Sequence, residues 1–325
     1  MSAALQKSAR IYVAGHRGLA GSALVRRLEG AGYTNLVTRT HAELDLTDAQ
    51  ATRAFFADQQ PEYVLLAAAK VGGILANDTY PADFIRENLA IQTNVIHQAW
   101  THGAKRLLFL GSSCIYPRDC PQPIREDYLL TGPLEATNRA YALAKIAGVE
   151  MCWSYNRQHG ARFLAAMPTN LYGPGDNYDL KNSHVLPALL RKMHEAKKSG
   201  ARQVEIWGSG RPLREFLHSD DMADACVHLL ELPEAAFDAL TQSKTVAPLV
   251  NVGTGIDQTI LELAGLIKKA VGYQGEFVFD PSKPDGTPRK LLDVSKLHGT
   301  GWQPRFTLET GLADAYRDFL AHHAK

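Results

Sequence analysis

The sequence predicts an α/β protein that joins a doubly wound parallel sheet to a smaller mixed α/β domain. Short apolar runs that suit buried strands alternate with helical patterns over the first half of the chain. A glycine-rich turn follows the first apolar run, and the alternation becomes irregular after about residue 170. The first two observations together are typical of a Rossmann sheet.

The strands and helices of the predicted sheet follow one another in a regular order. Strands are expected at 11–15, 36–40, 63–69, 106–112 and 162–167, and helices at 19–30, around 82–102 and at 138–159. Thr47 and Asp48 can cap a further helix that runs through Phe55 and Phe56. Because these strands alternate with helices long enough to cross the sheet, we expect right-handed parallel connections.

The second half of the chain is expected to form the smaller domain. Residues 168–183 are rich in Gly, Pro, Asn and Asp and predict a long loop. A helix is expected at 185–198 and a strand at 204–207. Residues 280–290 predict another long loop, which is a candidate lid.

The domain boundaries follow from this change of pattern. We expect a nucleotide-binding domain over residues 1–170 and a substrate-binding domain over residues 171–214 and 253–325. Residues 215–252 are expected to pack back on the first domain.

Composition and charge exclude several classes of function. A formal net charge of +1 at pH 7 indicates neither a nucleic-acid nor a membrane-surface partner. The cysteines at positions 114, 120, 152 and 226 form no C-x-x-C pair and no disulfide framework, and we expect no metal site. No apolar run is long enough to span a membrane, so a cytoplasmic protein is expected.

The turn after the first predicted strand has the pattern of a dinucleotide-binding loop. Its glycines permit a tight turn, a close approach of the backbone to a pyrophosphate and close packing of the next helix. The N-terminus of that helix supplies amide donors and a partial positive charge. We therefore expect a dinucleotide to contact Gly15, His16, Arg17, Gly18, Leu19, Ala20 and Gly21.

Charged residues near this turn favour NADP over NAD. An NAD enzyme usually has an acidic residue about 20 positions after the glycines. This chain has Arg39 and His41 there, and Arg17 in the turn itself. Cationic groups suit the 2′-phosphate of NADP, although each arginine is also compatible with ordinary surface charge. Asp45 and Leu46 are expected beside the adenine.

A tyrosine, a lysine and a serine predict reductase chemistry. Tyr141 and Lys145 lie four residues apart on one face of a helix, so their side chains can converge. The lysine, with a bound nicotinamide, would lower the pKa of the phenol from about 10 towards neutrality. Tyr141 could then exchange a proton at a carbonyl oxygen. Ser112 follows a parallel strand and would hydrogen-bond the same oxygen.

Cys114 stands directly after the two serines of GSSCIYP. By residue type alone, the more common role of such a cysteine is that of a small buried thiol that fills space. A reactive thiol is the alternative. These residues by themselves leave both roles open.

Several motifs together resemble those of one family. They are GHRG, AAAKVGGI, GSSCIYP, PTNLYGPGDN, NSHVLPALL, REFLH, NVGTG and SKPDGTPRKLLD. The similarity runs from residue 11 to about residue 303 and is to the extended short-chain dehydrogenase/reductase family. Within that family the chain resembles the bifunctional 3,5-epimerase-4-reductases. This resemblance implies a homodimer that converts GDP-4-keto-6-deoxy-D-mannose to GDP-L-fucose with NADPH.

The resemblance also implies roles for individual residues. Cys114 and His184 match the acid–base pair that inverts C3 and C5, whose protons are acidic beside the 4-keto group. Thiol and imidazole have reference pKa values of about 8.5 and 6.5, so both exchange protons near neutrality. The GDP-sugar would be held by Lys192, Trp207, Arg214 and Asp285. Further cofactor contacts are implied at Leu110, Gly111, Ser112, Ser113, Tyr141, Lys145, Pro168, Thr169, Asn170, Leu171 and His184.

Two departures from the family and two alternatives accompany these expectations. The family often has arginine where this chain has Lys192 and His41, which removes a bidentate contact and leaves Arg17 as the main 2′-phosphate residue. Sugar-nucleotide 4,6-dehydratases typically carry Asp-Glu where Ser113 and Cys114 stand.

The alternatives are another nucleotide-sugar epimerase or reductase of the family and a non-enzymatic NADP-sensing protein. The intact Tyr–Lys pair speaks against the second.

Overall fold

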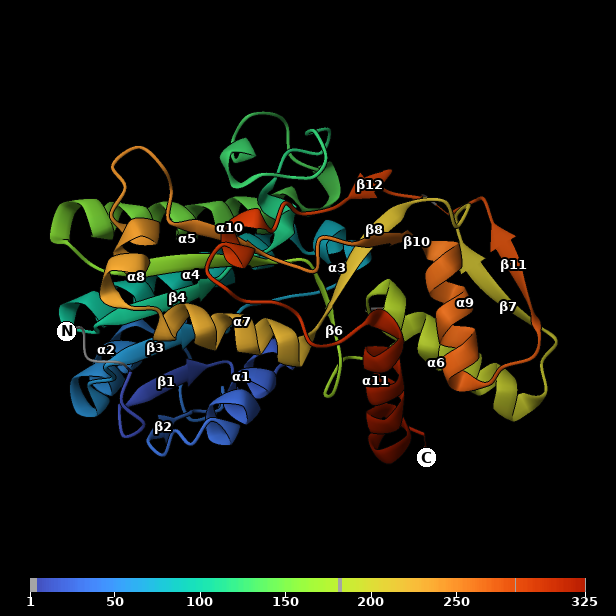
Figure 1. Cartoon of the computed structure of the whole chain (residues 1–325), viewed down its shortest axis with the longest axis horizontal. Helices are drawn as coiled ribbons and strands as arrows, with labels where there is room; N and C mark the ends of the chain where they lie inside the picture. The colour runs from blue at the N-terminus through green and yellow to red at the C-terminus, as the bar shows by residue number, and fades with distance from the viewer. Residues whose placement is uncertain (1–4, 181–182, 284, 325) are drawn as a thin grey trace.

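The computed structural model describes residues 5–180, 183–283 and 285–324. These residues form two parts that lie side by side (Figure 1). One part is a six-stranded sheet with helices on both faces, and the other is an assembly of short sheets and helices.

The main sheet is entirely parallel and has the strand order β2-β1-β3-β4-β5-β9. Its strands are β1 (Ile11–Ala14), β2 (Leu36–Val37), β3 (Tyr63–Leu66), β4 (Arg106–Leu110), β5 (Phe163–Pro168) and β9 (Leu249–Val252). The chain passes from β1 to β2 on one side and to β3 on the other. The carboxyl ends of β1 and β3 therefore border the kind of crevice in which doubly wound sheets bind ligands. This sheet confirms the predicted fold class.

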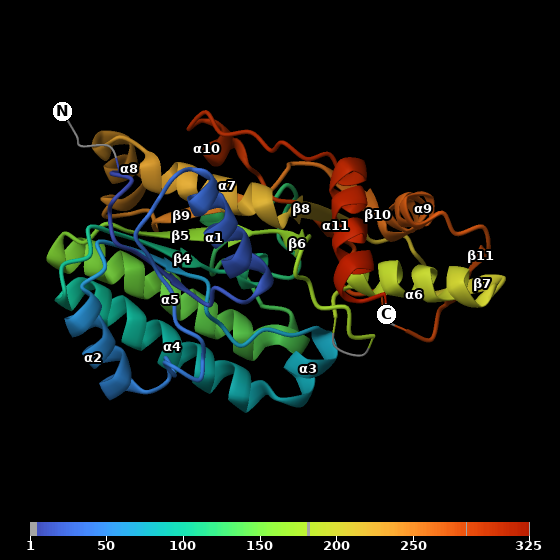
Figure 2. The same ribbon diagram turned by 90° about the horizontal axis from the view of Figure 1, so that it is seen from below.

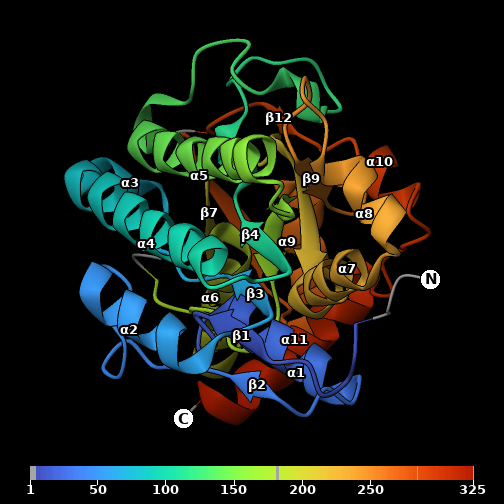
Figure 3. The same ribbon diagram turned by 90° about the vertical axis from the view of Figure 1, so that its left-hand side faces the viewer.

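Helices cover both faces of the main sheet (Figures 2 and 3). One face carries α1 (Leu19–Gly30), α7 (Ser219–Glu231) and α8 (Glu234–Thr241), and the other carries α2 (Ala49–Gln59), α4 (Pro81–Thr101) and α5 (Arg139–His159). Alternate residues of β1 point to opposite faces. Ile11 and Val13 join the core beneath α1, whereas Tyr12 and Ala14 join the core beneath α4 and α5. Both faces of the sheet are thus buried.

The smaller part is built around β8 (Leu213–His218). This strand pairs with β10 (Asp257–Thr259), β12 (Arg289–Lys290) and β6 (Asn170–Tyr172), the first antiparallel and the others parallel. A separate parallel pair joins β7 (Gln203–Trp207) to β11 (Glu276–Asp280). The helices α6 (Val185–Ser199), α9 (Ile260–Val271) and α11 (Leu308–His322) share one apolar core with these strands. Pairing in both directions gives this part its mixed α/β character.

Short elements complete the described chain. They are α3 (Ile74–Thr79), α10 (Ser295–His298) and the 3₁₀ turns η1 (Ser113–Ile115), η2 (Glu126–Tyr128) and η3 (Ala136–Asn138). Among the described residues, no helix combines the length and the apolar character needed to cross a membrane.

Some local predictions were wrong. β2 ends at Val37 instead of residue 40, because the chain turns at Thr40, whose amide donates to the Glu43 carboxylate at 2.7 Å. Asp48 alone caps α2. Residues 168–183 are not all loop, since β6 pairs with β8 inside this segment. The helix α3 was not predicted, because its six residues are too few for a helical pattern to be recognised.

Glu215 of β8 joins three separate segments of the chain. Its side chain is fully buried. Its carboxylate accepts hydrogen bonds from the amides of Thr254 at 2.6 Å, Gly255 at 2.8 Å and Leu292 at 3.0 Å. Burial raises the pKa of Glu215, and these backbone donors oppose that rise. The carboxylate therefore fastens the turn after β9 and the segment after β12 to the centre of the molecule.

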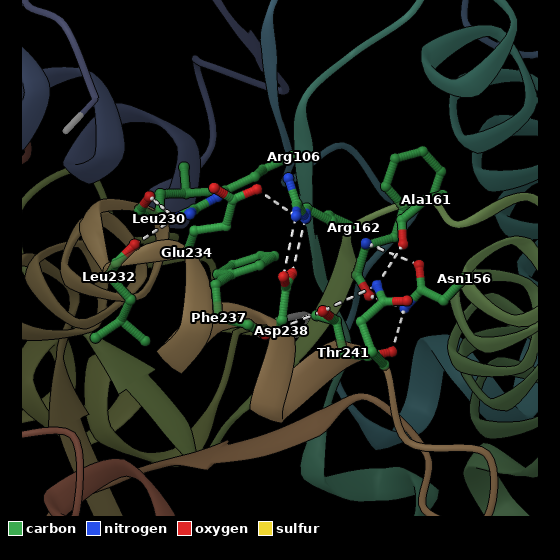
Figure 4. A network of polar contacts seen from close by, with 12 residues as sticks. Arg106, Asn156, Ala161, Arg162, Leu230, Leu232, Glu234, Phe237, Asp238 and Thr241 are labelled. Atoms are coloured by element: carbon green, nitrogen blue, oxygen red, sulfur yellow. Dashed lines mark hydrogen bonds and ion pairs between the residues drawn. The ribbon is translucent and has the colours of Figure 1, made fainter. Parts of the chain in front are cut away.

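A polar network closes the opposite end of the main sheet, where β4 and β5 begin (Figure 4). Arg106 donates to the carbonyl oxygens of Leu230 and Leu232, both at 2.7 Å, at the end of α7. Arg162 makes two hydrogen bonds to Asp238 of α8, at 2.7 and 2.9 Å. Asn156 of α5 completes the network. Its amide nitrogen donates to the carbonyl oxygens of Phe163 and Thr241, and its amide oxygen accepts from the Phe163 amide.

The buried amide of Asn156 gives a prediction about stability. Asn156→Ala leaves three backbone groups of Phe163 and Thr241 without partners. We expect a loss of about 3 kcal/mol of stability, since each stranded group costs about 1–3 kcal/mol. Thermal unfolding followed by circular dichroism measures it. The control is Gln242→Ala, which removes an exposed amide bound to the Ala161 carbonyl oxygen and should leave the midpoint nearly unchanged.

Candidate active site

The glycine-rich turn between β1 and α1 lies at the crevice. We call residues 15–21 the glycine cradle. Gly15 has a φ of +84°, and a Cβ at this residue would stand 2.7 Å from the backbone of Ala68. A Cβ on Gly21 would overlap the carbonyl oxygen of Gly15. Gly18 is the N-cap of α1, and no side chain of the described residues caps the helix there. The turn is therefore packed closely on the chain's own backbone, and the uncapped start of α1 offers amide donors to a pyrophosphate.

Two arginines lie near the outer end of this crevice. Arg17 is exposed in the turn, and Arg39 lies over the Phe55 ring, 5.5 Å from its centroid. Hydrogen bonds from Thr40 lower the pKa of Glu43, and the charges of Arg39 and Arg17 add to this effect. Both arginines therefore lie within electrostatic range of one carboxylate. This places them where a phosphate group of the cofactor could replace that carboxylate as their partner.

His41, Asp45 and Leu46 follow at the same end. The His41 side chain is 84% exposed, and its Nδ1 lies 3.9 Å from Oδ1 of Asp45. Hydrogen bonds from Thr47 lower the pKa of Asp45. The Leu46 side chain belongs to the core, and its carbonyl oxygen accepts from Asn94 at 2.8 Å. The turn thus holds the Asp45 carboxylate in place, whereas the His41 ring extends into solvent.

Ser112, Tyr141 and Lys145 come together beside the carboxyl end of β4. The Ser112 hydroxyl accepts from the Cys114 amide at 3.3 Å, and the Ser112 side chain lies close enough to Tyr141 to influence its pKa. The Lys145 ammonium donates to the Leu110 carbonyl oxygen at 2.8 Å and lies 5.8 Å from the centre of the Tyr141 ring. Strand β4 and helix α5 thus position all three side chains.

The pKa values at this point differ from the sequence prediction. Burial raises the pKa of Tyr141, repulsion from Cys114 adds to it, and the hydrogen bond with Ser112 opposes it. Burial lowers the pKa of Lys145 to about 7. The predicted lowering of the phenol pKa by Lys145 is therefore not found in the polypeptide by itself. A lysine that is only half charged near pH 7 stabilises a phenolate weakly, so the phenol keeps its proton at neutral pH.

Cys114 faces a lysine from the far end of the chain. The ammonium of Lys290 lies 3.6 Å from the Cys114 sulfur. His184, the N-cap of α6, keeps contact with solvent. The protein packed around its ring nevertheless lowers the pKa of His184, and the Lys290 charge adds to this effect. Lys290 is therefore within electrostatic reach of both members of the predicted acid–base pair.

A polar cavity adjoins the thiol. Its lining includes Cys114, Arg118, Glu135, Asn138 and Lys290. The Arg118 guanidinium and the Glu135 carboxylate pair at 3.6 Å. The Asn138 side-chain oxygen is buried, and it has no hydrogen-bond partner among the described residues. The cavity therefore offers a thiol, a cation and an open acceptor to a polar ligand.

The remaining predicted cofactor residues line the strand ends next to Ser112. Leu110 ends β4 and Pro168 ends β5, and Gly111, Ser113 and Thr169 are buried beside them. The Thr169 hydroxyl and the Asn170 amide donate to the Glu215 carbonyl oxygen at 3.2 and 2.8 Å. Asn170 and Leu171 belong to β6. These residues thus lie where the main sheet meets the smaller part.

The predicted substrate residues form a second group in the smaller part. The exposed Trp207 ring has the ammonium of Lys192 5.0 Å from its centroid and that of Lys283 at 5.5 Å. Asp285 binds the Ser209 amide at 2.6 Å and the Ser209 hydroxyl at 2.7 Å. Burial lowers the pKa of Arg214, and the charge of Asp285 opposes that change. Cations on an exposed aromatic ring suit a nucleoside diphosphate.

Sequence reasoning missed Lys290, Lys283 and Asn138. All three lie in or next to stretches that are easily located in the sequence, and Lys290 and Lys283 fall inside SKPDGTPRKLLD. The role of Lys290 was not apparent because this residue is 176 positions away from Cys114 along the chain. Only the folded chain brings the two together.

The residues at the crevice fit a dinucleotide. The glycine cradle would not accept a Cβ at Gly15 or Gly21, and the Nδ1 of His16 is buried without a hydrogen-bond partner among the described residues. Such an open polar atom beside a helix N-terminus suits a phosphate ligand. No group of three or more His, Cys, Asp or Glu side chains within residues 5–180, 183–283 and 285–324 could hold a metal ion.

Known proteins resemble the chain over nearly its whole length. Residues 11–240 match the model of the NAD dependent epimerase/dehydratase family. A putative GDP-L-fucose synthase 2 from Arabidopsis thaliana is 60% identical, with 97% of this chain and 93% of the relative covered. The GDP-L-fucose synthase of Escherichia coli is 56% identical, with 96% of each chain covered. A solved structure of a GDP-mannoheptose C4 reductase from Campylobacter jejuni with NADP bound has a TM-score of 0.88 and 40% identity, covering 97% of this chain and 99% of that one.

The glycine cradle gives a prediction about cofactor binding. In Gly21→Ala the new methyl group would overlap the Gly15 carbonyl oxygen, so the turn must shift. We expect kcat/KM for NADPH to fall by about 100-fold, the loss typical of a misplacement of about 1 Å. The control is Gly30→Ala, on the same helix, where a Cβ meets nothing within 4 Å. Initial rates at varied NADPH concentration with both variants check the result, and equal kcat/KM values would contradict it.

Proposed function

The chain belongs to the NAD dependent epimerase/dehydratase family, and we propose that it catalyses the GDP-L-fucose synthase reaction. In this reaction GDP-4-keto-6-deoxy-D-mannose is epimerised at C3 and C5 and then reduced at C4 with NADPH. The observation that carries the proposal is the location of Cys114 next to Ser112 and Tyr141. Cys114 and His184 both lie within reach of Lys290. Reduction alone requires the serine and the tyrosine, whereas a thiol and an imidazole suit epimerisation.

The enzyme uses NADPH, which supplies the hydride for C4 when it is bound. Ser112 lies close enough to Tyr141 to influence its pKa, so both side chains can approach the C4 oxygen of the sugar. The raised pKa of Tyr141 keeps the phenol protonated at neutral pH, ready to donate its proton to that oxygen. The hydrogen bond to the Leu110 carbonyl oxygen holds the Lys145 ammonium near the Tyr141 ring.

Epimerisation uses the same carbonyl as an electron acceptor. One member of the Cys114–His184 pair removes the proton from C3 or C5, and the C–H electrons move to the C4 oxygen to form an enolate. Hydrogen bonds from Ser112 and Tyr141 stabilise that negative charge. The other member then returns a proton to the opposite face of the carbon. The lowered pKa of His184 leaves its ring neutral at pH 7, with one nitrogen able to accept a proton.

The GDP moiety is proposed to lie on the smaller part. Lys192 and Lys283 flank the Trp207 ring, and Arg214 lies near Asp285. The substrate-binding domain of this proposal comprises residues 171–214 and 253–325, and the NADP-binding domain comprises residues 1–170 with 215–252. The sugar then enters the boundary between them, where Cys114 and Lys290 meet.

We further propose a homodimer located in the cytoplasm. Partly exposed rings lie together on α4 and α5, where Trp100 stacks on His159 at 4.2 Å and Tyr155 hydrogen-bonds His97 at 2.8 Å. An aromatic surface of this kind suits contact with a second copy. Light scattering after gel filtration measures the mass, and a monomer would contradict the dimer.

A second candidate function is the reduction of another GDP-4-keto sugar. The similar C. jejuni protein is described as a GDP-mannoheptose C4 reductase, so the same fold accepts a different sugar. Incubation with GDP-4-keto-6-deoxy-D-mannose and NADPH, followed by NMR of the product, distinguishes the two. Formation of GDP-L-fucose supports our proposal. Failure to oxidise NADPH with this substrate would contradict it.

Replacement of the catalytic tyrosine tests the reduction step. Tyr141→Phe removes only the phenolic hydroxyl, so we expect NADPH oxidation to slow by about 10²–10⁴-fold, the usual contribution of a positioned general acid. NADPH affinity should hardly change, because the glycine cradle is intact. The control is Tyr155→Phe, which removes a hydroxyl from another position on α5. Near-normal reduction by Tyr141→Phe would exclude this tyrosine as the acid.

Replacement of the cysteine tests the epimerisation step. Cys114→Ser is nearly isosteric, but a hydroxyl is too weak an acid or base at pH 7 to replace a thiol. We expect deuterium incorporation from D2O at C3 and C5 to fall by about 10²–10⁴-fold. Cys120→Ser is the control, since Cys120 is also partly exposed. Wild-type exchange by Cys114→Ser would mean that the thiol only fills space.

A further inference from the structure

The polar cavity beside the thiol is the part of the site to which the proposed function gives no role. Cys114, Asn138 and Lys290 line it, together with Arg118 and Glu135. We propose that this cavity receives the C3 hydroxyl group of the sugar, and that the Asn138 carboxamide is the specificity-determining group that hydrogen-bonds it. The inference rests on the proposed function, because it names the part of that substrate which the cavity recognises.

The Asn138 carboxamide is not used by the described residues of the protein. Asn138 is the N-cap of α5, yet its side chain makes no capping hydrogen bond. Its side-chain oxygen is buried and has no hydrogen-bond partner within residues 5–180, 183–283 and 285–324. A buried amide oxygen of this kind costs free energy unless a ligand supplies the missing donor. Rotation of the carboxamide brings either its oxygen or its nitrogen to the cavity, so it can accept from or donate to a hydroxyl group.

Neighbouring polar side chains of the cavity are already engaged. Arg118 pairs with Glu135 at 3.6 Å. The Gln122 side-chain oxygen accepts from the Leu291 amide at 2.8 Å. Asn138 therefore supplies a carboxamide that a ligand can engage without breaking a contact of the protein.

The backbone holds Asn138 close to the reacting groups. Asn138 ends η3, and Tyr141 follows in the first turn of α5. Cys114 lies in η1, which packs against α5. The ammonium of Lys290 lies 3.6 Å from the Cys114 sulfur and lines the same cavity. A sugar carbon that meets the thiol therefore has a substituent in reach of Asn138.

The chemistry of the two inverted carbons selects C3. In the proposed reaction C3 carries a hydroxyl group, whereas C5 carries a methyl group. A methyl group would leave the buried amide oxygen without a partner, and it gains nothing from charged and amide side chains. A hydroxyl group can donate to that oxygen or accept from the amide nitrogen. The cavity thus fits the C3 substituent.

The experiment measures the coupling between Asn138 and the C3 hydroxyl group. Initial rates of NADPH oxidation give kcat/KM for GDP-4-keto-6-deoxy-D-mannose and for its 3-deoxy analogue, which lacks only that hydroxyl group. The analogue keeps the 4-keto group and the C5 centre, so it can still be epimerised at C5 and reduced. We expect the wild-type enzyme to prefer the hydroxylated sugar by about tenfold, the typical contribution of one neutral hydrogen bond.

Three variants complete the test. In Asn138→Ala we expect kcat/KM for the hydroxylated sugar to fall by about tenfold, whereas kcat/KM for the analogue stays unchanged because no hydrogen bond is lost. Damage to the structure alone would slow both reactions. Asn138→Asp keeps an acceptor oxygen and should retain most of the preference. The control is Asn35→Ala, which removes an amide at the amino end of β2, bound to the Ser8 carbonyl oxygen at 3.3 Å, and it should match the wild type.

Two outcomes would overturn the inference while the proposed function stands. One is a wild-type enzyme that uses both sugars equally well, and this result is decisive even if Asn138→Ala fails to fold. The other is a folded Asn138→Ala variant that keeps the wild-type preference for the hydroxylated sugar. A wild-type enzyme that oxidises NADPH with neither sugar would instead refute the proposed function, and the inference about Asn138 would fall with it.

Discussion

The buried carboxylate of Glu215 is the contact on which the geometry of the candidate site depends. It is fully enclosed, and it is tolerated there because the amides of Thr254, Gly255 and Leu292 satisfy it. The same residue receives Thr169 and Asn170 on its backbone oxygen. One side chain and one carbonyl group therefore unite the end of β5, the turn after β9 and the segment that carries Lys290.

This joint explains why the reactive groups lie at the boundary between the two parts. Strand β4 and helix α5 supply Ser112, Tyr141 and Lys145, whereas β12 supplies Lys290 from the other side. Burial between the two parts then tunes the groups. It raises the pKa of Tyr141 and lowers the pKa of Lys145 to about 7, so the phenol keeps its proton and the amine readily loses one. The crevice thus holds a phenol and an amine whose pKa values are both near 10 in water but shift in opposite directions here.

Most of the main sheet was predictable because its signals are local. Continuous apolar runs are found as β1, β3, β4 and β5, and the helix over 138–159 is found as α5 (Arg139–His159). The errors occur where pairing with a distant strand decides the structure. Residues 170–172 have the composition of a loop, yet they form β6 because β8 lies beside them. β2 is shorter than its apolar pattern because Thr40 binds Glu43 and turns the chain.

The sequence by itself determined the parts of the site that depend on neighbours along the chain. The spacing of Gly15, Gly18 and Gly21 defines the turn, and the four-residue spacing of Tyr141 and Lys145 places them on one helix face. Only the tertiary structure decided which lysine meets the cysteine, since Lys290 is 176 positions from Cys114. It also decided the direction of each pKa shift. Spacing carries no information on burial, and burial sets the energy of a charged group.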